Sequence, residues 1–124
     1  MLLKELLCVG AGSFAGGVVR YLVGLAMKSV GSGFPCGTFT VNIVGCLLIG
    51  LLCGLLPLTG ERGGGLLSLF LIVGFCGGFT TFSTFSKESL ALLQAGCYVT
   101  FTLYVVGSLV LGLAAVALGY LLTK

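Results

Sequence analysis

Charged side chains are scarce in this chain. Lys, Arg, Asp and Glu make up 7% of its 124 residues, against about a quarter in a soluble domain. The charges leave four charge-free runs, at residues 6–19, 29–60, 63–86 and 89–123. Because a helix needs roughly 20 apolar residues to cross the hydrocarbon core of a bilayer, we expect spans near residues 3–27, 37–56, 66–93 and 98–122. The sequence therefore predicts an all-α membrane protein, with residues 1–124 as a single transmembrane domain.

Residues that carry out most enzyme chemistry are also missing. The chain contains no histidine, and Glu5, Glu61 and Glu88 are its only carboxylates. Transition-metal sites, acid–base pairs and catalytic triads are built largely from these residue types, so we do not expect an enzyme. The six cysteines show no C-x-x-C spacing, and we expect them to be unpaired and to pack as small apolar side chains. A net charge of +3, scattered along the chain, does not favour nucleic acid as a partner.

Glycine, in contrast, is abundant, with 22 residues. Small residues four apart, which share one helix face, occur at Gly12 and Gly16, Gly50 and Gly54, and Ser108 and Gly112. In lipid, such faces let helix backbones approach closely and drive association. The turn-like stretches 31–35, 57–63 and 94–96 are short, which predicts that consecutive helices are antiparallel neighbours. We expect a compact bundle that forms an oligomer.

Positive charges are divided equally between the two ends of such a bundle. If the helices alternate in direction, one side holds Lys4, Arg62 and Lys124, and the other holds Arg20, Lys28 and Lys87. Lys/Arg asymmetry normally sets the orientation of a membrane protein, and an equal count gives no bias. We expect insertion in both orientations and pairing of opposite copies as an antiparallel, dual-topology homodimer. The alternative is a single orientation set by weak local effects.

Residues 74–86 form the most unusual stretch of the sequence. Gly77 and Gly78 each cost about 1 kcal/mol in helix propensity relative to Ala, and the Thr/Ser run that follows can hydrogen-bond its own backbone. We therefore expect the third helix to be broken at mid-membrane. Backbone broken at that depth is tolerated where it is buried in protein or lines a wet cavity. Its freed carbonyls are then available to coordinate a cation such as Na⁺.

Side chains after the break sort onto separate helix faces. Phe79, Phe82 and Phe85 recur every three residues; two hydroxyl stripes lie beside them, one of Thr80, Ser83 and Lys87 and one of Thr81, Thr84 and Glu88. An aromatic stripe usually serves packing. Beside hydroxyls, however, the partly positive ring edges could touch an anion without binding it tightly.

A few polar residues lie within the other predicted spans. Asn42 is the only carboxamide there, and a polar residue at this depth is costly and suggests function; the alternative role is an interhelical hydrogen bond. Tyr104 and Ser108 are one helical turn apart and could continue a polar track. Arg20, near a helix end, either extends to the interface or makes a vestibule electropositive.

Three blocks of the sequence resemble the small bacterial fluoride channels of the Fluc or CrcB family. They are residues 16–21, 37–45 and 74–88, they occur in the family's order, and the match that runs through them covers most of the chain. The third block, GFCGGFTTFSTFSKE, is highly specific, whereas the first two are weak alone.

The resemblance implies a channel that exports fluoride passively across the bacterial cell membrane, with two pores in a dual-topology homodimer. It implies a structural Na⁺ at the dimer centre, held by the main-chain carbonyls of Gly77 and Thr80 of each subunit. It also implies fluoride pathways lined by Asn42, Phe82, Phe85, Ser83, Thr84, Tyr104 and Ser108. The residues themselves indicate only a narrow, uncharged path with hydrogen-bond donors and a positive rim, from which a small anion can leave.

Two other functions are compatible with a small four-helix membrane protein. A small multidrug-resistance exporter is also a short dual-topology dimer, but it needs a membrane carboxylate that exchanges protons for drug. All three Glu residues lie near predicted span ends, and the chain has no Trp for an aromatic drug pocket. A scaffold that transports nothing would account for the glycine faces but not for the Thr/Ser/Phe run.

Overall fold

A computed structural model describes residues 1–30, 33–56 and 65–124. It contains four helical segments long and apolar enough to cross a membrane, Leu2–Ala26, Cys36–Leu55, Gly65–Gln94 and Tyr98–Thr123. Each bound lies within one residue of the sequence prediction, because the apolar runs and the turn residues between them are sharply separated. The first, second and fourth segments are single helices: α1 (Leu2–Ala26), α2 (Cys36–Leu55) and α6 (Tyr98–Thr123).

The third segment is composed of four pieces. These are α3 (Gly65–Ser68), η1 (Leu69–Cys76), α4 (Gly77–Phe79) and α5 (Phe82–Gln94). The η1 piece is a π-helix, a wide form that usually occurs as a single turn and often at functional sites. No feature of the sequence predicted this π-helix. The segment is helical from Gly65 to Phe79 and is then interrupted at Thr80 and Thr81, which have extended backbones.

The interruption is not where glycine propensity would put it. Gly77 is helical, with φ −62° and ψ −37°, and Gly78 also lies within α4. An added Cβ at Gly78 would lie 3.0 Å from the Cα of Ser13, so this glycine permits close packing against α1. The break therefore lies within the predicted stretch, at the two threonines that follow the glycines, while the glycines themselves remain helical.

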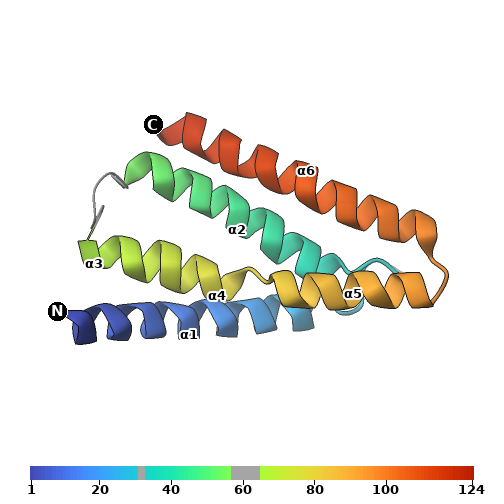
Figure 1. Ribbon diagram of the computed structural model, residues 1–124, viewed down its shortest axis with the longest axis horizontal. Coiled ribbons are helices and arrows are strands. Elements are labelled where there is room, and N and C mark those ends of the chain that lie inside the picture. The colour runs from blue at the N-terminus through green and yellow to red at the C-terminus, as the bar shows by residue number, and fades with distance from the viewer. Residues whose placement is uncertain (31–32, 57–64) are drawn as a thin grey trace.

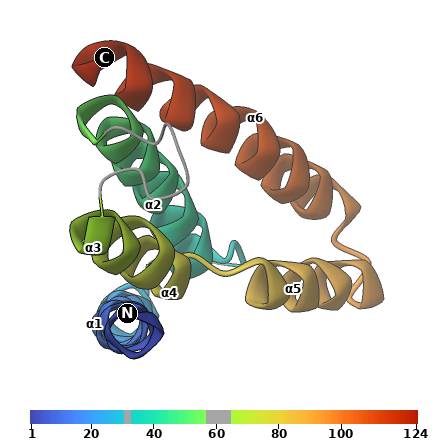
Figure 2. The same cartoon turned by 60° about the vertical axis from the view of Figure 1, so that its left-hand side comes forward.

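The tightest packing joins alternate segments (Figures 1 and 2). α1 lies along η1 and α4, while α2 lies along α6, and the two helices of each pair run in the same direction. Consecutive segments run antiparallel, as expected, and α6 follows α5 through a short turn in which Gly96 has a φ of +77°. Their mutual contacts are less extensive than those of the alternate pairs. The expected turn at residues 57–63 lies outside the described residues.

Glycine faces make this close packing possible. An added Cβ at Gly16 would lie 2.9 Å from the amide nitrogen of Phe79, and one at Gly12 would lie 2.8 Å from that of Phe75. On the other pair, a Cβ at Gly50 would overlap the backbone of Val116. The predicted small-residue faces of the first and second segments are thus helix–helix contacts, consistent with packing in lipid.

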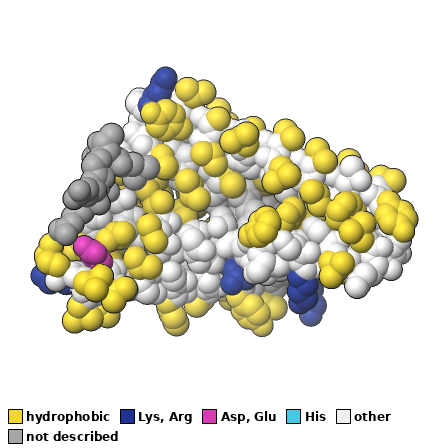
Figure 3. Space-filling view, in the orientation of Figure 1, with side chains coloured by type: hydrophobic (Ala, Val, Ile, Leu, Met, Phe, Trp, Pro, Cys, Tyr) yellow, Lys and Arg dark blue, Asp and Glu magenta, His cyan; other side chains and the backbone are white. Residues whose placement is uncertain are grey.

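Little of the apolar surface is buried within one chain. The described buried core consists of Val41, Cys76, Phe79, Phe85 and Tyr104, whereas hydrophobic side chains are spread over the face shown in Figure 3. Leu113 and Phe14 are 74% and 76% exposed. Soluble monomers rarely expose contiguous apolar surface on this scale, so lipid or further protein must cover it. All six cysteines are free, as expected.

Candidate functional site

The break in the third segment is held by the side chain of Asn42 on α2. Its Nδ2 donates a hydrogen bond to the Thr81 carbonyl at 3.1 Å, and its Oδ1 accepts one from the Thr81 N–H at 2.8 Å. One carboxamide therefore satisfies both backbone groups of a residue that has left the helix. The interhelical hydrogen bond, one of the two roles expected for Asn42, is present. Its second Nδ2 hydrogen is left for another acceptor.

Thr81 also starts the second half of the segment. Its Oγ1 accepts a hydrogen bond from the Thr84 N–H at 3.2 Å, which caps the N-terminus of α5 as Thr side chains commonly do. The Ser83 hydroxyl lies 3.4 Å from the same oxygen. This capping explains why the helix restarts immediately after two extended residues.

Carbonyl groups before the break lose their usual helical partners. The Thr80 N–H bonds the Cys76 carbonyl at 3.0 Å, and the Thr81 N–H bonds Asn42, so neither reaches the Gly77 carbonyl. Arg20 Nε donates to the Gly78 carbonyl at 3.1 Å. Arg20 thus has a role that the sequence did not suggest: it supplies a hydrogen-bond donor to one of the carbonyls that the break releases.

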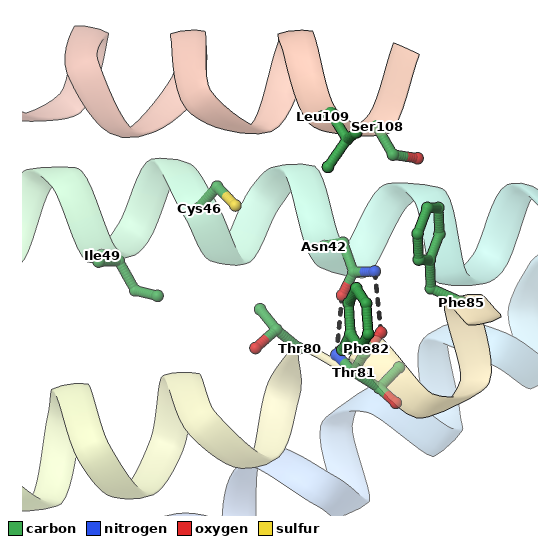
Figure 4. A pocket seen from close by; sticks show the side chains of 9 residues that line it. All are labelled: Asn42, Cys46, Ile49, Thr80, Thr81, Phe82, Phe85, Ser108 and Leu109. Carbon is green, nitrogen blue, oxygen red and sulfur yellow. Dashed lines mark hydrogen bonds between the residues drawn. The ribbon is translucent and has the colours of Figure 1, made fainter. Parts of the chain in front are cut away.

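An open cavity of about 240 Å³ lies beside the break, between α2, α5 and α6 (Figure 4). It is lined by Asn42, Cys46, Ile49, Thr80, Thr81, Phe82, Phe85, Ser108 and Leu109. Four of the residues predicted to line a fluoride path therefore meet around one cavity. The Ser108 hydroxyl oxygen is buried and has no hydrogen-bond partner among the described residues.

The two predicted phenylalanines differ in burial. Phe85 is 8% exposed and Phe82 is 76% exposed, although their ring centroids are only 5.8 Å apart. Phe79, on the other side of the break, is 5% exposed and stacks on Phe75 at 5.7 Å. The three rings therefore do not form one continuous stripe, because the extended threonines separate Phe79 from the other two.

Tyr104 lies behind Phe85 in an aromatic cluster. Its ring centroid is 5.0 Å from that of Phe85 and 5.5 Å from that of Phe34, and the residue is fully buried. Its hydroxyl donates a hydrogen bond to Glu88 Oε1 at 3.1 Å. Tyr104 is thus near the cavity but does not line it.

A second cavity, of about 370 Å³, lies toward the C-terminal end of α1. Its polar lining consists of the cations Arg20 and Lys28 and of hydroxyls, without a carboxylate: Arg20, Tyr21, Lys28, Thr38, Thr81 and Thr84. Thr84 therefore lies on a different cavity from the phenylalanines, and the exposed Ser83 lines neither of the two. Thr81, which bonds Asn42 and lines both cavities, was not singled out as a path residue in the sequence.

The donors at the break suit a hard cation. No group of three or more His, Cys, Asp or Glu side chains that could hold a metal occurs within residues 1–30, 33–56 and 65–124. Main-chain carbonyls bind Na⁺ in broken membrane helices, and the Gly77 carbonyl has lost its helical partner, the Thr81 N–H. Gly77 is exposed, and an added Cβ there would meet nothing within 4 Å. A hard cation such as Na⁺ therefore fits the oxygen ligands at the break.

Comparison with known proteins identifies the family. Residues 7–120 match the family model described as CrcB-like protein, Camphor Resistance (CrcB). The chain is 49% identical to the fluoride-specific ion channel FluC of Chlorobaculum tepidum, with 100% of this chain and 98% of that protein covered. It is 45% identical to the FluC of Azobacteroides pseudotrichonymphae, with coverage of 99% and 98%. The chain thus belongs to the CrcB family of ion channels, and it is a bacterial multi-pass membrane protein and not an enzyme.

Proposed function

We propose that this chain conducts fluoride passively across the cell membrane, through the cavity at the break in its third segment. The observation that carries the proposal is the convergence of Asn42, Phe82, Phe85 and Ser108 on that cavity. The relatives described above carry the name fluoride-specific ion channel, and the family resemblance assigns the fluoride path to these same four residues.

The chemistry of the cavity suits a small anion. Its nine lining residues include no charged side chain, so an anion meets neither repulsion nor a strong ionic trap. Asn42 keeps one N–H to donate. The buried Ser108 hydroxyl lacks a partner within the described part of the chain, a state that costs about 1–3 kcal/mol and that an anion in the cavity would relieve.

The resemblance assigns the further pathway roles to residues around this cavity. Tyr104 supports Phe85 from behind, while Ser83 and Thr84 lie in the first turn of α5, beside the Thr81 cap. Arg20 and Lys28 give the second cavity the positive charge expected of a vestibule. Fluoride would pass from this cationic cavity to the aromatic one.

The working unit in this proposal is an antiparallel, dual-topology homodimer with a structural Na⁺ at its centre. Two features support it: Phe82 is 76% exposed in a single chain, and the Gly77 carbonyl lies at an exposed site without its helical partner. The Gly77 and Thr80 carbonyls of two subunits would together hold the ion. Bound Na⁺ would neutralise carbonyl dipoles at the junction and so hold the two breaks together.

Reconstitution tests the proposed activity. Purified protein in liposomes loaded with potassium fluoride should release fluoride to an ion-selective electrode once valinomycin balances the charge, and chloride-loaded liposomes should release little. Release that instead requires an imposed proton gradient would favour the exporter, as would transport of an organic cation. Equal release of chloride would contradict fluoride selectivity.

Orientation is tested by adding charge. Two or three Lys residues added at one end should bias insertion to one orientation, because the native Lys and Arg residues give no net bias. Fluoride flux should fall and then recover when an oppositely biased copy is coexpressed. Full flux from a population with one orientation would contradict the antiparallel dimer.

A further inference from the structure

The two cavities beside the break meet at a single residue. The aromatic cavity is lined by Asn42, Phe82, Phe85 and Ser108, and the cationic cavity by Arg20, Lys28 and Thr84; of all the residues that line either of them, only Thr81 lines both. An anion in either cavity would therefore lie beside this threonine.

Thr81 is held rigidly in this place. Asn42 bonds both its N–H, at 2.8 Å, and its carbonyl, at 3.1 Å, and Figure 4 shows the two bonds side by side at the edge of the aromatic cavity. The Thr84 N–H bonds its Oγ1 at 3.2 Å. Backbone and side chain are thus both fixed, which is the arrangement needed for a donor that must not move with its ligand.

The Thr81 hydroxyl still has its own hydrogen to give. A hydroxyl has one donor and two acceptor positions, and the Thr84 N–H occupies one acceptor position. The hydroxyl of the exposed Ser83 lies at a long 3.4 Å, so the bond between the two hydroxyls is weak and easily exchanged. The O–H can therefore turn toward an anion in either cavity.

From this geometry we propose that Thr81 passes fluoride between the cavities, by donating its hydroxyl hydrogen bond to the ion as the ion leaves the cationic cavity and enters the aromatic one. The proposal rests on the proposed fluoride conduction. It assigns Thr81 a contact with the ion, separate from its role as the cap of α5. Asn42 gains a second role, because its two hydrogen bonds to the Thr81 backbone position this donor.

Three substitutions separate the two roles of Thr81. Thr81→Ser keeps both the cap and the donor. Thr81→Asp keeps an acceptor for the Thr84 N–H, since Asp is a good N-cap, but its carboxylate has no hydrogen to donate and its charge repels an anion. Thr81→Val keeps the shape and loses both functions. Thr102→Val is the matched control, because it removes a hydroxyl that bonds the Tyr98 carbonyl within α6, away from both cavities.

The measurement is the rate of fluoride release per assembled dimer, with size-exclusion chromatography to count dimers. We expect Thr81→Ser and Thr102→Val to match the unmodified protein, and Thr81→Asp and Thr81→Val to lose about tenfold or more, since a hydrogen bond to a charged group is worth roughly that factor. If Thr81→Asp does not assemble, Thr81→Val decides alone, because its rate is counted per dimer.

Three results would overturn the proposal. A wild-type release rate in Thr81→Asp would mean that Thr81 serves only as a cap, and a wild-type release rate in Thr81→Val would also exclude its hydroxyl from the path. A slower release rate in Thr81→Ser would assign the effect to the methyl group. These failures leave wild-type conduction intact. Absence of fluoride release from the unmodified protein would instead refute the proposed function, and this inference with it.

Discussion

Replacement of Asn42 should damage both the stability of the helix break and the flux of fluoride. In Asn42→Ala, the Thr81 N–H and carbonyl both lose their partner. An unpaired buried backbone group costs about 1–3 kcal/mol, so these two part-buried groups together cost up to about 6 kcal/mol. This is a large part of the roughly 5–15 kcal/mol that stabilises a typical folded protein.

Asn42→Asp should be milder in stability and equally severe in transport. The carboxylate still accepts the 2.8 Å bond from the Thr81 N–H, but an oxygen now faces the Thr81 carbonyl, which had accepted a bond from Nδ2. Only one backbone group is left unpaired, at about 1–3 kcal/mol. The negative charge also repels fluoride in a medium of low dielectric constant.

Two assays separate these effects. The fraction of dimer that survives heating, measured by size-exclusion chromatography, should fall in the order wild type, Asn42→Asp, Asn42→Ala, while fluoride release per dimer should be lost in both variants. Thr123→Val is the control: it removes a 2.9 Å interhelical bond to the Leu51 carbonyl, distant in sequence from the break, and should cost about 1 kcal/mol without slowing release. Wild-type heat stability in Asn42→Ala would show that the two hydrogen bonds from Asn42 do not stabilise the break. Wild-type fluoride release in Asn42→Asp would show that Asn42 does not line the fluoride path.

Two further predictions test packing and the buried hydroxyl. Gly16→Ala should reduce the yield of folded protein sharply, because its methyl would lie 2.9 Å from the Phe79 nitrogen, whereas Gly17→Ala, whose methyl meets nothing within 4 Å, should fold normally; equal yields by size-exclusion chromatography would contradict the contact of α1 with η1 and α4. Ser108→Ala should slow fluoride release without lowering heat stability, since the lost hydroxyl has no partner among residues 1–30, 33–56 and 65–124; a drop in heat stability would mean that Ser108 makes a structural bond.

The sequence predicted the spans well because each depends on local composition. Long apolar runs and short turns determine where α1, α2 and α6 begin and end, and glycines four apart marked the faces of α1 and α2 that pack closely. Which helices these faces contact was not predictable in the same way. Short connections suggested consecutive neighbours, whereas the closest contacts join alternate segments, because small residues at matching depths permit the closest backbone approach.

The sequence predicted which residues form the site better than it predicted how they are arranged. A Thr/Ser run after two glycines signals a weak helix, but the break occurs where Asn42 offers partners to the Thr81 backbone, and that partnership spans 39 positions in the sequence. Likewise, the bond from Arg20 to the Gly78 carbonyl depends on how α1 lies against α4. The π-helix η1 has no local signature in its eight apolar residues.

The most direct test of the central claim, that fluoride passes the aromatic cavity, is the release rate of Phe82→Ile and Phe85→Ile beside Phe79→Ile. An aliphatic residue fills much of the space but lacks the partly positive ring edge, and such swaps usually cost less than about 1.5 kcal/mol. Phe82 and Phe85 line the cavity, whereas Phe79 stacks on Phe75 outside it. Release per dimer should fall strongly in Phe82→Ile and Phe85→Ile and should be largely retained in Phe79→Ile. Normal release in Phe82→Ile and Phe85→Ile, with failure in Phe79→Ile, would contradict a fluoride path through the aromatic cavity and would place the path on the other side of the break.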